Sequence, residues 1–144
     1  MLLLGSHAGF RRISQNLIAA ATDTEDRGAI GLYFGMWISA MRSHERYEEH
    51  KLYPYLERFH GAELQVLRDG HEELHAAEVA VRSALQGDGD LREALVAHDD
   101  VLDRHLELEE DRVIPLLLEM DSAEFARYAS QPIETLLTGT HTSA

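Results

Sequence analysis

Three pairs of residues that could bind a metal occur at a spacing of four in the chain. They are His44 and Glu48, His71 and His75, and His105 and Glu109. On a helix, residues four apart lie on the same face, one above the other, so both members of a pair could hold one ion. A seventh candidate ligand, His7, lies near the N-terminus.

The apolar residues around these candidates predict that all seven are buried. In each of the three segments the pair interrupts a stripe of apolar residues at spacings of three and four, and His7 shares such a stripe with Phe10 and Leu17. One His-x-x-x-Glu pair is expected about once by chance in a chain of this composition. Burial of an ionisable group without a partner is costly, so the whole set on apolar faces indicates a metal site.

The ligand set favours iron, manganese or zinc, because it offers imidazoles and carboxylates and the sequence contains no cysteine. If Glu48 and Glu109 each bridge two octahedral ions, the candidates and one oxo or hydroxo bridge leave a single coordination position open. A small diatomic molecule or peroxide would bind there. Four apolar residues are expected in the core and could also wall this position against water: Phe10, Phe34, Trp37 and Leu102.

Long helices are predicted to carry these ligands. The apolar periodicity predicts helices over residues 3–21, 25–59, 62–86 and 91–120, and a short helix over 122–129 with Ser122 as its N-cap. Pro54 is expected to kink the second helix, and Gly70 lowers the helix propensity of the third. No segment alternates with a period of two. We therefore predict an all-α, up-down-up-down four-helix bundle over residues 1–130, followed by a tail over residues 131–144.

Composition excludes several classes of function. The 144 residues suit one domain, and 26 acidic against 13 basic residues give a net charge of -13, which argues against a nucleic-acid partner. The absence of cysteine excludes disulfides, thiolate metal sites and iron–sulfur clusters. The N-terminus is not typical of a signal peptide, and no stretch approaches the roughly 20 apolar residues of a membrane span. We expect a cytoplasmic protein with no membrane partner; its oligomeric state stays open.

The order of the motifs resembles the hemerythrin-like cation-binding domain family. A lone histidine is followed by a His-x-x-x-Glu pair that leads into Leu52-Tyr53-Pro54, by a His-x-x-x-His pair and by a second His-x-x-x-Glu pair, over residues 3–118. The resemblance implies a four-helix bundle with two non-haem iron ions, bridged by oxo or hydroxo. Such a centre binds or senses dioxygen, peroxide or nitric oxide, or handles iron.

The resemblance also implies a role for each candidate. The histidines match terminal ligands and the glutamates match bridging carboxylates: His7, His44, His71, His75 and His105, and Glu48 and Glu109. The oxygen carriers of the family end the last motif with an aspartate at a spacing of five, whereas this chain has Glu109 at a spacing of four. Glu110, at a spacing of five, is an alternative to Glu109 that the sequence leaves open.

Two other functions fit parts of the sequence, so whether the protein is an enzyme stays open. One is a catalase-like enzyme that degrades peroxide at the same di-iron centre. The other is a zinc metalloprotease, since His71-Glu72-Glu73-Leu74-His75 has the form of the H-E-x-x-H motif. A protease needs a strand edge for its substrate, and none is predicted. Glu72 lies about 100° around the helix from His71 and is expected to face solvent.

The remaining histidines are expected to be ordinary core or surface residues: His50, His60, His98 and His141. His98 is the one with a second interpretation. It lies two helical turns before His105 on the same stripe, so it could pack in the core or form a hydrogen bond to a metal ligand.

Overall fold

Helices make up almost all of the structure, a computed structural model that describes residues 2–24 and 26–132. The long helices are α1 (Leu2–Asp23), α2 (Arg27–Tyr47), α4 (Gln65–Leu85) and α5 (Leu91–Glu119). A π-helical turn, η1 (Glu48–Leu52), joins α2 to the short α3 (Tyr53–His60), and α6 (Ser122–Ser130) follows α5. The described residues contain no strand. The predicted all-α class and the predicted helices are confirmed, whereas His141 and most of the predicted tail lie outside the described residues.

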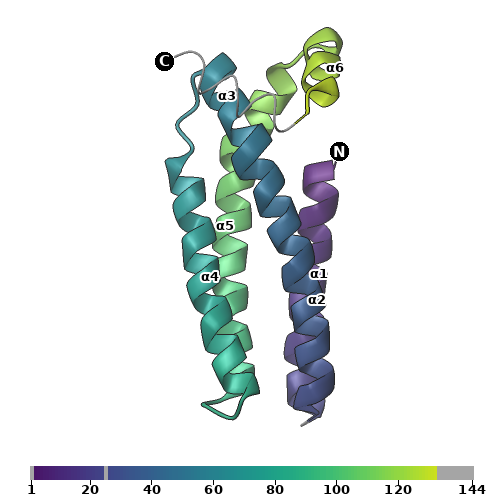
Figure 1. Ribbon diagram of the computed structural model, residues 1–144, viewed down its shortest axis with the longest axis vertical. Coiled ribbons are helices and arrows are strands. Elements are labelled where there is room, and N and C mark those ends of the chain that lie inside the picture. Colours follow the sequence, from purple (N-terminus) through teal and green to yellow (C-terminus); the bar gives the residue numbers. More distant parts are fainter. Residues whose placement is uncertain (1, 25, 133–144) are drawn as a thin grey trace.

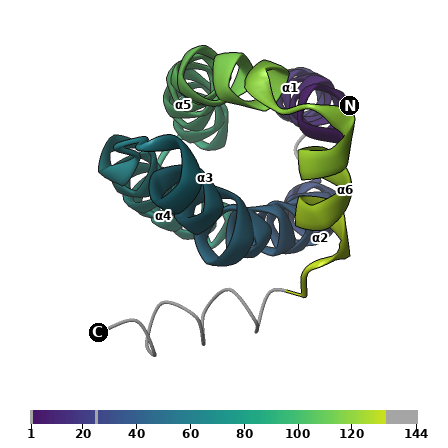
Figure 2. The ribbon, with the colours of Figure 1, turned by 90° about the horizontal axis from the view of Figure 1, so that it is seen from above.

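The long helices form an up-down-up-down bundle (Figure 1). α5 packs along both α4 and α1, and α2 packs against α1 and α4, so the four helices form a closed ring in the order α1, α2, α4, α5. Figure 2 shows this ring from above, with α6 across the end of the bundle where α1 begins. Every helix therefore presents one face to a common interior, as the apolar stripes require.

Acidic side chains begin three of the helices. Asp26, Asp90 and Asp121 lie at the N-caps of α2, α5 and α6, and each side chain accepts a hydrogen bond from a backbone N–H three residues on, at 2.7–3.0 Å. These bonds satisfy amide groups that have no partner within the helix. The cap of α6 is thus Asp121, and the prediction that Ser122 caps it is wrong: Ser122 is the first residue inside the helix.

The π-helical turn lies just before Pro54. The backbone N–H of Tyr53 donates to the carbonyl of Glu48, five residues earlier, in place of the usual four. Proline has no N–H to donate and its ring crowds the carbonyl four residues before it, so a wider turn accommodates it within the helix. A π-helical turn thus lies where the sequence predicted a kink, and it begins at the candidate ligand Glu48.

Two apolar clusters fill the interior, and a polar layer separates them. One cluster includes Phe34, Trp37, Leu74 and Leu102, and the other includes Leu52, Leu56, Leu67 and Val113. Between residues of the first cluster and residues of the second along the chain lie His44, Glu48, His71 and Glu109. The bundle therefore holds its ionisable groups between two apolar regions.

Within the described residues, no helix is both long enough and apolar enough to cross a lipid bilayer.

Phe34 provides a test of the larger apolar cluster. Its side chain is fully buried, whereas that of its neighbour Tyr33 is 69% exposed. We expect Phe34→Ala to lower the free energy of unfolding by about 3–5 kcal/mol, because it removes buried area and leaves a cavity. Tyr33→Ala, the matched control on the same helix, should change it by no more than about 0.5 kcal/mol. Urea denaturation of both variants measures this, and equal losses would contradict the packing described.

Candidate metal centre

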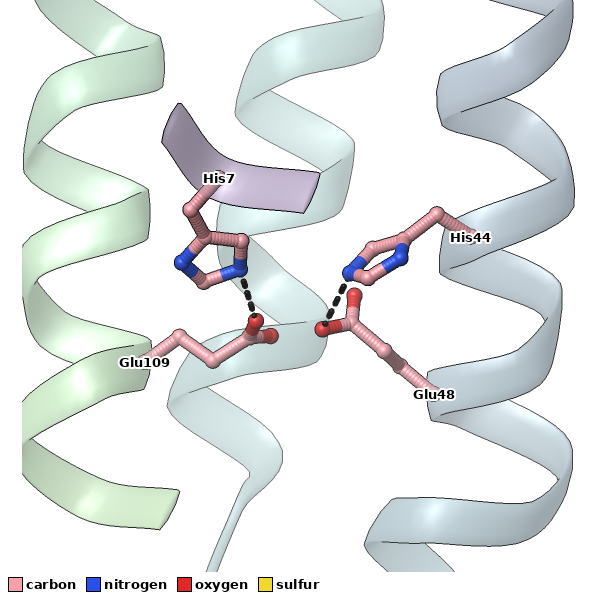
Figure 3. A group of neighbouring side chains, drawn as sticks. All are labelled: His7, His44, Glu48 and Glu109. Carbon is pink, nitrogen blue, oxygen red and sulfur yellow. Dashed lines mark hydrogen bonds and ion pairs between the residues drawn. The ribbon is translucent and has the colours of Figure 1, made fainter. Parts of the chain in front are cut away.

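Six of the seven candidate ligands come together in the polar layer. They form two overlapping groups, and within each group the potential ligand atoms all lie within 4.8 Å of one another. The first group is His7, His44, Glu48 and Glu109; the second is Glu48, His71, His105 and Glu109. Glu48 and Glu109 belong to both groups, which is the arrangement expected of carboxylates that bridge two ions. Figure 3 shows the first group, with the two carboxylates facing each other, Glu109 next to His7 and Glu48 next to His44.

Each long helix contributes to the centre. α1 supplies His7, α2 supplies His44, α4 supplies His71, and α5 supplies both His105 and Glu109. Glu48 is the first residue of the π-helical turn that continues α2. The spacing of four keeps His44 beside Glu48 and His105 beside Glu109, with nitrogen-to-oxygen distances of 3.2 and 3.8 Å.

The contacts among these groups leave polar atoms unsatisfied. Nε2 of His7 lies 2.8 Å from Oε1 of Glu109, and Nε2 of His71 lies 3.2 Å from Oε1 of Glu48. Nε2 of His44 lies 3.2 Å from Oε2 of Glu48, but neither atom has a hydrogen-bond partner of suitable geometry, although both are buried. Buried polar atoms without partners are rare, and a cation between them would satisfy them. The donor set therefore fits metal ions.

Titration of these groups reflects their crowding. Burial would raise the pKa of Glu48, but a hydrogen bond with the neighbouring Glu109 and the imidazoles of His44 and His71 outweigh it and lower this pKa to about 2. Burial raises the pKa of Glu109, and the neighbouring Glu48 adds to the effect. Burial alone would lower the pKa of His71, but hydrogen bonds to Glu48 and Glu49 raise it to about 9. The pKa of His105 falls to about 4, mainly because its ring is buried. Protons thus supply the positive charge that the buried carboxylates need, and metal cations would replace them.

Two further glutamates orient the histidines from behind. Nδ1 of His7 lies 2.9 Å from Oε2 of Glu110, which also accepts a hydrogen bond from Arg11 at 2.8 Å. Nδ1 of His71 lies 2.8 Å from Oε1 of Glu49. A carboxylate on the outer nitrogen of a histidine fixes the ring and strengthens the inner nitrogen as a ligand. Of the two adjacent glutamates, Glu109 belongs to both ligand groups and contacts Nε2 of His7. Glu110 contacts the other ring nitrogen, Nδ1.

A small cavity adjoins the centre. Its volume is about 10 Å³, close to the minimum that holds one water molecule. Its polar walls are His44, Glu45, Glu48, His71 and His105, and its apolar walls are Phe10, Met41, Leu74, Leu102 and Leu106. Phe10 and Leu102 thus lie where an open coordination position would need an apolar wall, whereas Phe34 and Trp37 pack against His98 farther along the bundle.

His75 is the one candidate ligand outside both groups. Its Nε2 lies 2.7 Å from Oε2 of Glu45, and Glu78 completes a separate group with them. His98 does not reach a ligand either, because both of its ring nitrogens are buried without a hydrogen-bond partner, between Phe34 and Trp37. It is a packed core residue, and the alternative role considered for it is not seen.

Comparison with known families agrees with this geometry. Residues 2–117 match the hemerythrin HHE cation-binding domain. The chain belongs to this family. Comparisons with curated proteins and with solved structures gave no match. Because the family is one of cation-binding domains, the histidine and glutamate groups of this hemerythrin-family bundle are the residues that could hold a metal cation.

Tyr53 is a residue of the centre that sequence analysis missed. Its fully buried hydroxyl donates a hydrogen bond to Oε2 of Glu109, and its ring stacks on His71 with 5.9 Å between centroids. Burial and the nearby carboxylates raise the pKa of Tyr53, so the hydroxyl keeps its proton. The only sequence signal was its place beside Pro54. In this hemerythrin-family domain Tyr53 fixes the orientation of a shared carboxylate.

Gly70 explains how His105 fits beside α4. A Cβ atom on Gly70 would lie 2.3 Å from Nδ1 and 3.1 Å from Cε1 of His105, so only glycine lets the ring approach the helix. The weak helix propensity noted at this position is the cost of that approach.

We expect Gly70→Ala to displace His105 and to lower metal affinity by at least about tenfold. Gly35→Ala is the matched control, since a Cβ there meets nothing within 4 Å and alanine favours a helix by roughly 1 kcal/mol. Metal content after dialysis and the melting temperature measure both effects. Normal metal binding by the Gly70 variant would show that the close approach is not needed.

Tyr53→Phe should weaken metal binding by about tenfold or more, because Glu109 loses the donor that orients it while the ring packing is kept. Competition with a chromogenic chelator measures this affinity. The control is Tyr55→Phe, since Tyr55 donates instead to Glu124 of α6. Equal affinities for the two variants would rule out an orienting role for Tyr53.

Proposed function

We propose that this hemerythrin-family domain holds two iron ions and binds a small oxidant, namely dioxygen, peroxide or nitric oxide. The observation that carries the proposal is that two ligand groups share both of their carboxylates, Glu48 and Glu109. Nitrogen and oxygen donors without thiolates suit iron, as the family resemblance also suggests. The oxo or hydroxo bridge expected from the sequence belongs to this proposal.

Each residue has a definite task in this proposal. His7 and His44 hold one ion, His71 and His105 hold the other, and the two shared glutamates bridge them. When bound, the iron pair would supply the electrons and the open coordination positions with which a small oxidant reacts. The assignment of His75 as a further terminal ligand stays a prediction from the sequence.

The cavity beside the centre favours a small uncharged ligand. It is about the size of one water molecule, and five apolar side chains form half of its wall. Such a wall excludes bulk water and larger substrates from the open position. A molecule of two non-hydrogen atoms would enter by a small shift of the side chains.

The metalloprotease alternative has little support in the geometry. His71 and His75 belong to different groups, and the side chain of Glu72, the base of the H-E-x-x-H pattern, is 82% exposed. Within residues 2–24 and 26–132 there is no strand against which an extended peptide could lie.

Elemental analysis and the visible absorption spectrum test the proposal. We expect about two irons per chain after reconstitution, with charge-transfer bands that change on reduction and return in air. His44→Ala and Glu48→Gln should lose iron and colour, and chelators should lower the melting temperature of the parent protein. His60→Ala is the control, because His60 bonds to Glu124 away from the centre. One colourless zinc per chain would overturn the proposal.

Rapid mixing with H₂O₂ separates a binding protein from a catalase-like enzyme. A binding protein should consume about one equivalent and bleach, because its adduct does not turn over. Steady evolution of O₂ that His44→Ala removes would instead establish catalysis.

A further inference from the structure

A second group of potential ligands lies beside the centre. Glu45 of α2 and His75 and Glu78 of α4 have ligand atoms within 4.8 Å of one another. None of the three belongs to the two groups that share Glu48 and Glu109. One imidazole and two carboxylates form a set that binds zinc or ferrous iron with water in the remaining positions.

The two carboxylates of this outer group are buried and only half satisfied. Glu45 is 7% exposed and Glu78 is 2% exposed. Oε2 of Glu45 lies 2.7 Å from Nε2 of His75, and Oε2 of Glu78 accepts a hydrogen bond from Arg42 at 2.6 Å. Oε1 of each carboxylate is buried without a hydrogen-bond partner. A buried carboxylate oxygen without a donor is costly, and a divalent cation would satisfy both.

The outer group is open to solvent through His75 and borders the cavity of the centre through Glu45. The side chain of His75 is 29% exposed, so a cation in solvent can reach it. Glu45 lines the cavity whose other polar walls are His44, Glu48, His71 and His105. Glu45 thus contacts the outer group on one side and the cavity of the centre on the other.

We propose that Glu45, His75 and Glu78 form a separate divalent-cation site, through which cations enter the centre by way of Glu45. The entry role rests on the proposed function, whereas the existence of the site does not. Arg42, which is half exposed, occupies Glu78 while no cation is bound, and it moves into solvent when one binds.

Zinc titration of the iron-loaded protein tests the site. We expect one zinc ion per chain beyond the iron, detected by calorimetry and elemental analysis. Glu78→Gln should weaken this binding at least about tenfold while the visible spectrum of the iron stays unchanged. The control is Glu72→Gln on the same helix, which removes an exposed carboxylate and should have no effect. Arg42→Ala should tighten zinc binding, because Glu78 loses its competing partner.

The rate of loading tests the entry role. In stopped-flow mixing of metal-free protein with ferrous iron in air, Glu78→Gln should slow the growth of the iron absorption several-fold without changing its final spectrum. Glu72→Gln should load at the parent rate.

His75→Ala separates this proposal from the assignment of His75 to the centre. We expect this variant to lose the outer zinc and to keep both irons and their spectrum. Loss of the iron spectrum would overturn the proposal and show that His75 is a ligand of the centre. Zinc binding unaffected by both Glu78→Gln and Arg42→Ala would also overturn it. Failure of the parent protein to hold iron would instead refute the proposed function, and the zinc titration of the variants would still decide whether the outer site exists.

Discussion

The structure depends on the burial of ionisable groups between two apolar clusters. Glu48 and Glu109 are both fully buried, and their negative charges lie close together in a region of low dielectric. Such charges are tolerated only when positive charge is brought to them. Protons on the surrounding histidines meet this need in part, as the raised pKa of His71 shows. Two cations bound by the same residues would meet it more fully. Metal binding would therefore stabilise the folded domain.

The surrounding residues serve this layer in related ways. The sequence His-x-x-x-Glu-Glu occurs twice, at residues 44–49 and 105–110. In each copy the first glutamate of the final Glu-Glu pair, Glu48 or Glu109, belongs to the centre. The second contacts the outer nitrogen of a histidine on another helix: Glu49 contacts His71, and Glu110 contacts His7. The two copies therefore contribute in the same way. Each supplies one histidine of the centre itself and orients a second histidine, on another helix, through its last glutamate.

Sequence periodicity was enough to predict the helices and to find the six residues that the structure brings together, because a spacing of four fixes which residues share a helical face. It was not enough for features that depend on a neighbouring helix. Glu109 and Glu110 are adjacent and both acidic, so only the position of His7 between them separates their roles. From the sequence, Gly70 only weakens its helix. The structure shows that its missing side chain makes room for the ring of His105. Tyr53 has no ligand motif of its own, and its only sequence signal is its place beside Pro54.

His75 shows why spacing alone does not assign a ligand. His75 lies one turn beyond His71 on the same helical face, but its Nε2 contacts Glu45 of α2 and not the shared carboxylates. The position of Glu45 also couples the two places where a cation could bind. Ions in the outer group and in the centre would repel each other, since their charges have the same sign. An outer ion is then held most firmly while the centre is empty and more weakly once it is filled. A site with this order of affinities would pass cations on to the centre and would store them poorly.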